Sequence, residues 1–120
     1  MLTVTSPHKA LEYFENKLEF TIDPVGLNEA IKNREVNIID VRDEKDYKKG
    51  HIPTAINLPR ERWDTFEGLT HERPNVVYCY GITCLLSTKA AKEFSLNDFP
   101  MMELIGGFEE WERRGLWIER

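Results

Sequence analysis

The sequence predicts an α/β domain in which helices cover both faces of a central, mainly parallel sheet of about five strands. Apolar stretches that suit strands alternate at least four times with stretches whose apolar residues recur at helical spacing, which is typical of parallel sheets with right-handed crossovers. Two strand candidates, residues 36–41 and 76–79, are almost continuously apolar, which indicates strands buried on both faces. A length of 120 residues fits a single domain.

The first elements expected along the chain are a helix, a short strand and a second helix. Ser6-Pro7 supplies an N-cap and a first-turn proline. The apolar stripe of this helix is Ala10, Leu11, Phe14 and Leu18. Residues 20–22 are a strand candidate, and Asp23-Pro24 begins the next helix. We expect residues 1–19 to form a helical extension packed on the domain, where it covers an edge of the sheet, and residues 20–120 to form the domain itself.

The rest of the chain continues the alternation of strands and helices. The expected strands are residues 36–41, 55–58, 76–79 and 102–105. The expected helices are residues 43–49, 60–66, 86–96 and the stretch that carries Phe108 and Trp111 as core anchors. Asp40 is a carboxylate within an apolar strand, where an unpaired charge is costly. We therefore expect Asp40 to be paired, either with Arg42 or with a loop amide.

Charge and hydropathy argue against several classes of partner. The chain has 21 acidic and 16 basic residues and a formal net charge of -5, which repels nucleic acid. No apolar run approaches the roughly 20 residues that a membrane helix needs, so we expect a cytoplasmic protein without a nucleic-acid or membrane partner. The two cysteines, Cys79 and Cys84, share one short loop, which fits neither a secreted disulfide framework nor a closed zinc site.

Cys79 is the candidate nucleophile because it stands between the end of a buried strand and the start of a helix. Open parallel sheets bind their ligands outside the carboxyl ends of the strands. Loop amides and the positive end of a helix dipole would both favour a thiolate here, so we expect the pKa of Cys79 to be lowered. The alternative is an inert, buried cysteine, but the position before a glycine-containing loop favours chemistry.

Four motifs, in this order, resemble the signatures of rhodanese-like domains. They are Asp40-Val41-Arg42, Gly50-His51-Ile52-Pro53 with Ala55-Ile56-Asn57-Leu58-Pro59, Val76-Val77-Tyr78-Cys79, and Gly106-Gly107-Phe108 with Trp111 and Gly115. The resemblance runs from about Phe20 to the C-terminus and implies a rhodanese-like three-layer sandwich. It also implies a single-domain sulfurtransferase, without a metal or organic cofactor. Such an enzyme moves sulfane sulfur from a small-molecule donor such as thiosulfate, through a Cys79 persulfide, to a thiol, another thiophilic acceptor or a protein acceptor.

The resemblance also assigns the residues around the nucleophile. The active-site loop would be Tyr80, Gly81, Ile82, Thr83 and Cys84, and its amides would hold the persulfide. Asp40 and Arg42 would brace the core near the loop, and His51 would belong to a structural turn. Cys84 replaces the arginine or small polar residue that is more usual in the family. A thiol redox sensor that uses a Cys79/Cys84 pair therefore stays open, as does a noncatalytic binding module.

Phosphatase chemistry is not expected from this loop. The related phosphatases have a loop that is one residue longer and ends in arginine, and Leu85 occupies that position here. The planar guanidinium that would stabilise a phosphoryl transition state has no substitute in this loop.

Overall fold

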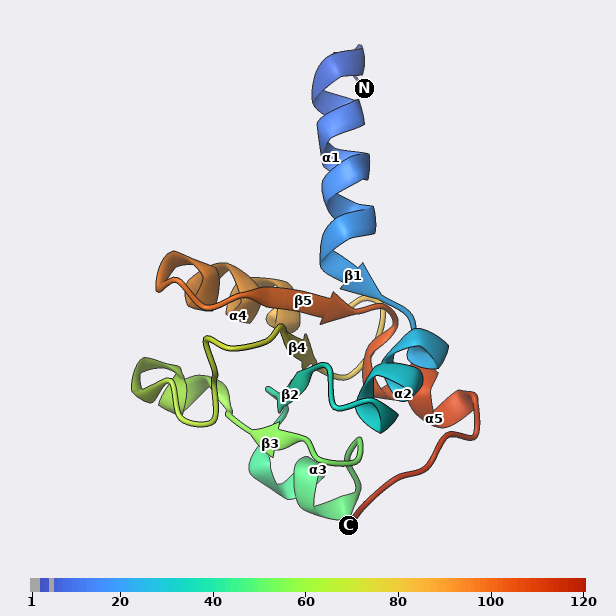
Figure 1. Cartoon of the computed structure of the whole chain (residues 1–120), viewed down its shortest axis with the longest axis vertical. Helices are drawn as coiled ribbons and strands as arrows, with labels where there is room; N and C mark the ends of the chain where they lie inside the picture. The colour runs from blue at the N-terminus through green and yellow to red at the C-terminus, as the bar shows by residue number, and fades with distance from the viewer. Residues whose placement is uncertain (1–2, 5) are drawn as a thin grey trace.

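The computed structural model describes residues 3–4 and 6–120 and confirms the α/β class. One sheet contains five strands in the order β1-β5-β4-β2-β3, and every neighbouring pair is parallel (Figure 1). The strands are β1 (Thr21–Ile22), β2 (Asn37–Asp40), β3 (Ile56–Asn57), β4 (Asn75–Tyr78) and β5 (Met101–Leu104). The α-helices are α1 (Pro7–Phe20), α2 (Pro24–Lys32), α3 (Glu44–Lys49), α4 (Leu86–Leu96) and α5 (Gly107–Arg113).

The expected elements are present, with one change of type. Arg60–Thr65 forms the 3-10 helix η1, where a helix over residues 60–66 was expected. It ends at Thr65 and is followed by Phe66, which has a left-handed φ of 54° and donates its backbone N–H to the carbonyl oxygen of Trp63. The strands begin and end within a few residues of the predicted bounds, and β4 ends at Tyr78, so that Cys79 is the first residue beyond it.

Two separate cores explain why the central strands are apolar on both faces. Along β2 and β4, Ile38 and Val76 contribute to one hydrophobic cluster, while Ile39 and Val77 contribute to the other. The first cluster also contains Leu27 of α2 and Trp111 of α5. The second contains Ala90 and Phe94 of α4. Cys79 belongs to the second cluster, so its side chain lies on the face of the sheet that α4 covers.

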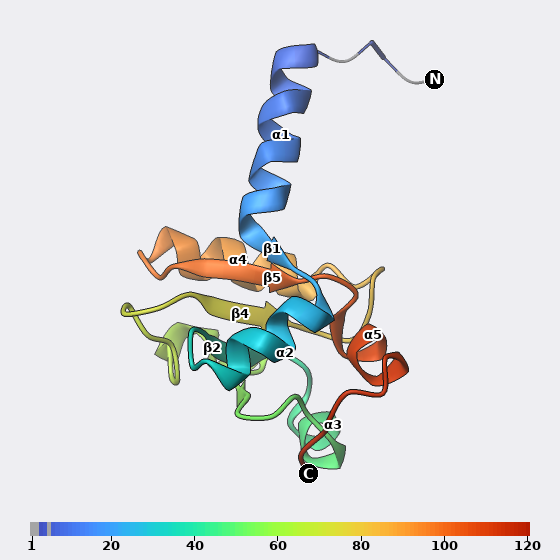
Figure 2. The ribbon, with the colours of Figure 1, turned by 45° about the vertical axis from the view of Figure 1, so that its right-hand side comes forward.

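Helix α1 projects from the sheet instead of packing along it (Figures 1 and 2). No described residue of α1 is buried, and the side chains of Leu11 and Phe14 are each 58% exposed. The packing of residues 1–19 on the domain stays a prediction, and residues 1, 2 and 5 lie outside the described part of the chain. Helix α1 ends at Phe20 and β1 begins at Thr21, so no turn separates the helix from the sheet. No helix in the described residues is both long and apolar enough to cross a membrane.

Candidate active site

The loop that follows β4 is fixed at its start by two other helices. At the N-terminus of α5, the Phe108 N–H donates to the carbonyl oxygen of Cys79 at 2.9 Å, and the Glu109 N–H donates to that of Tyr80 at 2.9 Å. The Tyr80 hydroxyl donates to Asp46 of α3 at 2.7 Å and accepts from the N–H of Asp43 at 3.2 Å. Burial and the hydrogen bond to Asp46 raise the pKa of Tyr80 to about 12. The backbone of Cys79 is thus held on both sides.

Gly107 lets α5 approach the loop this closely. Its φ is +63°, and a Cβ there would lie 2.9 Å from the carbonyl oxygen of Cys79 and 2.9 Å from the nitrogen of Gly81. Gly115 also has a positive φ of +70°, but a Cβ there would meet nothing within 4 Å. The two glycines therefore share one backbone conformation and differ in the space around them.

Gly107→Ala is expected to destabilise the protein more than Gly115→Ala. Both substitutions place a Cβ in the left-handed region, at a cost of about 1 kcal/mol. Gly107→Ala must also displace the backbone of the loop, which brings its expected loss of unfolding free energy to about 2–4 kcal/mol. Chemical denaturation of the two variants measures the difference. Equal midpoints would show that the loop has room for the methyl group.

The sulfur of Cys79 is buried, with the residue 1% exposed. It lies 3.6 Å from the carbonyl oxygen of Cys84 and 3.7 Å from the hydroxyl oxygen of Ser87. The backbone N–H of Ser87, in the first turn of α4, lowers the pKa of this thiol. The strand-loop-helix position predicted for Cys79 is therefore present, between β4 and α4.

The predicted lowering of the Cys79 pKa is wrong. Burial raises the pKa of the Cys79 thiol, and its interaction with Cys84 raises it further, against the opposing effect of Ser87. For Cys84, partial burial opposes ionisation, but hydrogen bonds from the Cys79 thiol and from the N–H groups of Leu86 and Tyr80 lower its pKa. Backbone N–H groups in the first turn of α4 thus lower the pKa of both sulfurs, Ser87 for Cys79 and Leu86 for Cys84. In the resting protein, Cys84 is the more acidic thiol of the pair.

Asp40 and Arg42 form a buried ion pair, as the sequence led us to expect. The Arg42 guanidinium donates to Asp40 at 2.8 Å and to the carbonyl oxygen of Gly50 at 2.6 Å, and the Tyr78 hydroxyl donates to Asp40 at 2.6 Å. Arg42 also stacks 4.0 Å from the ring centre of Phe108. Burial of Arg42 opposes its charge, but Asp40 outweighs this and raises the pKa of Arg42. Burial, reinforced by Asp40, raises the pKa of Tyr78.

This cluster connects β2, β4 and α5 behind the loop and does not contain Cys79. His51 was expected in a turn but forms an isolated antiparallel bridge with Glu119. Its Nδ1 lies 2.9 Å from the carbonyl oxygen of Tyr47, and its ring stacks on that of Tyr47 at 3.9 Å. Trp111 is fully buried, and its indole N–H donates to the carbonyl oxygen of Trp117 at 2.9 Å. Within the described residues, no group of three or more His, Cys, Asp or Glu side chains is arranged to hold a metal ion.

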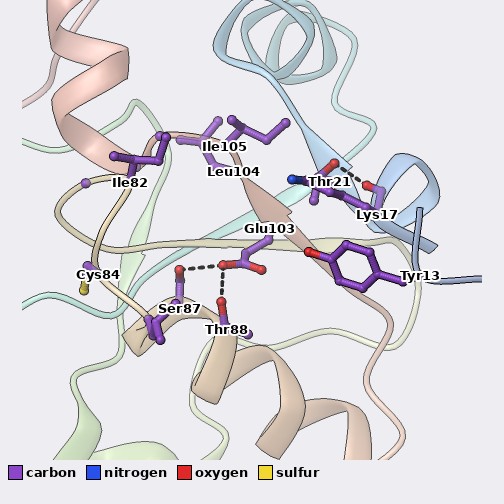
Figure 3. A pocket seen from close by; sticks show the side chains of 14 residues that line it. Tyr13, Lys17, Thr21, Ile82, Cys84, Ser87, Thr88, Glu103, Leu104 and Ile105 are labelled. Carbon is purple, nitrogen blue, oxygen red and sulfur yellow. Dashed lines mark hydrogen bonds between the residues drawn. The ribbon is translucent and has the colours of Figure 1, made fainter. Parts of the chain in front are cut away.

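A pocket of about 320 Å³ lies between α1, the loop and the first turn of α4 (Figure 3). Inside it, the hydroxyls of Ser87 and Thr88 donate to the same oxygen of Glu103, at 2.9 and 2.7 Å. The sulfur of Cys84, which also lines the pocket, points away from Glu103 (Figure 3). Neither Ser87 nor Glu103 was predicted from the sequence as part of the site. The sequence held one signal for Glu103, because it is a charged residue within an otherwise apolar stretch, residues 101–105.

Comparison with protein families finds that the model described as "Rhodanese-like domain" matches residues 23–114. The chain is 37% identical over 87 residues to the thiosulfate sulfurtransferase GlpE of Coxiella burnetii, covering 70% of this chain and 78% of GlpE. It is 34% identical over 101 residues to the HTH-type transcriptional regulator Rv0324 of Mycobacterium tuberculosis. That match covers 81% of this chain but 45% of the regulator, so the chain spans less than half of that relative.

Among solved structures, the BH2092 protein of Bacillus halodurans is similar to nearly the whole chain. The two share 36% sequence identity and superpose with a TM-score of 0.83, over 95% of this chain and 86% of that one. Because coverage of 95% leaves few residues unmatched, most of α1 has a counterpart in that structure. The α1 extension is therefore a feature that the two proteins share.

Proposed function

Because the chain belongs to the rhodanese-like domain family, we propose that it is a sulfurtransferase that carries sulfane sulfur on Cys79. The observation that carries this proposal is the position of Cys79 at the C-terminal end of β4, at the start of the loop that leads into α4. The relatives named thiosulfate sulfurtransferase support the same reaction class. A small-molecule sulfur donor and a thiophilic acceptor are the substrates that this chemistry requires.

The proposed reaction has two displacement steps at sulfur. The Cys79 thiolate attacks the outer sulfur of thiosulfate, the S–S bond of thiosulfate breaks, and sulfite leaves with the electron pair. The sulfur is then held as a Cys79 persulfide near the N-terminus of α4, where backbone N–H groups favour negative charge. An acceptor thiolate or cyanide attacks the outer sulfur, and the Cys79 thiolate leaves with the electron pair of the broken bond.

Mass spectrometry of the intact protein tests this proposal. After incubation with thiosulfate and removal of small molecules, the protein is expected to gain the mass of one sulfur atom and to lose it on addition of cyanide. A known thiosulfate sulfurtransferase, treated in parallel, is the positive control. If the control gains sulfur and this protein gains none from thiosulfate or from other sulfane donors, the proposal fails and a noncatalytic binding module is favoured.

Cys84→Ser is expected to load sulfur at least as fast as the wild type at neutral pH. The charge of Cys84 and its hydrogen bond with Cys79 both raise the pKa of Cys79, so the substitution leaves a larger fraction of Cys79 as the nucleophilic thiolate. The measurement is the rate of sulfite release from thiosulfate. Loading slowed by more than about tenfold would show that Cys84 takes part in the transfer.

The second candidate function is a thiol redox switch, favoured by the proximity of Cys79 to the backbone of Cys84 and by their opposite effects on each other's pKa. Peroxide would convert one thiolate to a sulfenic acid, and the other thiol would then form a disulfide and release water. Peptide mapping after mild peroxide treatment tests this. A Cys79–Cys84 crosslink supports the switch, whereas overoxidised Cys79 beside free Cys84 rejects it.

A further inference from the structure

Two side chains, Ser87 and Glu103, connect the buried sulfur to the neighbouring pocket. The Cys79 sulfur lies 3.7 Å from the Ser87 hydroxyl oxygen, and that hydroxyl lies 2.9 Å from Glu103 of β5. Thr88 donates to the same Glu103 oxygen at 2.7 Å. Unlike Ser87, Thr88 makes no hydrogen bond with the Cys79 sulfur within the described residues. Figure 3 shows both hydroxyls turned toward the carboxylate. Ser87 is therefore shared between the nucleophile and an acid that the proposed reaction does not use.

The direction of these hydrogen bonds follows from the chemistry of the groups. An ionised carboxylate has no hydrogen, so Ser87 and Thr88 must be the donors to Glu103. A hydroxyl carries one hydrogen, so while Ser87 donates to Glu103 it can only accept from Cys79. A thiol has a hydrogen for Ser87 to accept, and a thiolate has none. In this arrangement the hydroxyl stabilises the protonated form of Cys79, and it can lower the pKa of Cys79 only by turning to donate to the sulfur.

We propose that Glu103 is a positioning residue that keeps the Ser87 hydroxyl turned away from Cys79 and thereby favours the thiol form of the nucleophile. To form a well-stabilised thiolate, Ser87 must give up its bond to Glu103 and donate to the sulfur. Glu103 thus sets the pH range in which Cys79 can be loaded. This inference deepens the proposed function, since it rests on Cys79 as the sulfur carrier.

Other charged groups also face this region. Near the sulfurs are Cys84 and Lys89 of α4, and Glu109 of α5 packs against Gly81 of the loop. Around Glu103, the groups that line the pocket include Lys17 of α1 and the hydroxyl of Tyr13, which Figure 3 shows facing the carboxylate. Substitutions at Glu103 leave all of these in place, so a change in Cys79 ionisation can be assigned to the loss of the Glu103 carboxylate.

The test is the pH dependence of Cys79 alkylation by iodoacetamide, measured in the full chain that carries Cys84→Ser so that one thiol reports. Glu103→Met keeps the length of the side chain and removes the strong acceptor. It is expected to lower the midpoint pH and to raise the alkylation rate at neutral pH by about tenfold, the value of one charge-assisted hydrogen bond. Glu103→Gln keeps an oxygen that accepts from Ser87, and its midpoint is expected to stay closer to that of the parent protein.

Two controls separate positioning from charge and from damage to the fold. Thr88→Val changes the same carboxylate without touching the sulfur and is expected to leave the midpoint unchanged. In a Ser87→Ala background, Glu103→Met is expected to have no further effect. The inference is overturned by an unchanged midpoint in Glu103→Met, by equal shifts in the Met and Gln variants, which would indicate charge alone, or by a shift that persists without Ser87.

Alkylation is measured without a sulfur donor, so the two proposals can fail separately. If Glu103→Met shifts the midpoint but thiosulfate adds no sulfur, the positioning role stands and the sulfurtransferase function fails. If thiosulfate loads Cys79 but the midpoint does not move, the function stands and the role of Glu103 fails.

Discussion

Cys79→Ser is expected to reduce sulfur transfer from thiosulfate to cyanide by on the order of 10³-fold or more, the scale seen when a nucleophile is removed. The serine hydroxyl is a much weaker nucleophile toward sulfur than a thiolate and cannot form a persulfide. Because Cys79 is buried beside Cys84 and Ser87, the slightly smaller hydroxyl fits the same space. The measurement is the rate of thiocyanate formation.

Cys84→Ser is the matched control for this substitution, because it makes the same chemical change five positions along the same loop. It is expected to retain transfer, and thermal unfolding should show that both variants are folded. A Cys79→Ser variant that keeps more than about a tenth of the wild-type rate would show that Cys79 is not the sulfur carrier.

The largest expected effect on stability is that of Asp40→Ala, at about 3–5 kcal/mol of unfolding free energy. Asp40 is fully buried and Arg42 nearly so, and removal of the carboxylate leaves the guanidinium buried without its counter-charge. The Tyr78 hydroxyl also loses its acceptor. Since small domains are stable by about 5–15 kcal/mol, the variant is expected to unfold at a much lower denaturant concentration.

Glu44→Ala removes one partner of an exposed ion pair, Lys48 with Glu44 at 2.8 Å, and is the control for loss of a carboxylate. Exposed pairs contribute little because water screens them, so its denaturation curve is expected to overlay that of the wild type. The geometry of the buried pair indicates that it holds β2 to its neighbours. An Asp40→Ala denaturation curve that overlays that of the wild type would show that it does not.

The sheet and the position of the nucleophile could be predicted because single residues carried strong local signals. Ile38 and Ile39 are adjacent and both buried, which requires a strand covered on both faces, and Asp40 in the same run requires a buried partner. Cys79 follows a strand of the same kind. Side chains along one strand point alternately to the two faces of the sheet, so a continuous apolar run in the sequence is enough to show that both faces are covered.

The remaining features depend on contacts between elements that are distant in the sequence. Helix α1 projects because no residue separates it from β1, a boundary that periodicity does not fix to one residue. Glu103 meets Ser87 because of how α4 lies on β5. The pKa of Cys79 is raised by burial, and that of Cys84 is lowered by hydrogen bonds that outweigh its burial. The linear spacing of two cysteines in one loop contains neither effect.

The most direct test of the central claim is the location of the sulfur after the wild-type protein has reacted with thiosulfate. Alkylation of the persulfide, followed by proteolysis and fragmentation of the loop peptide, assigns the added sulfur to one residue. We predict one additional sulfur on Cys79, with Cys84 alkylated as an ordinary thiol. An additional sulfur on Cys84, or a peptide without added sulfur while the control enzyme is loaded, would contradict the assignment of Cys79 as the sulfur carrier.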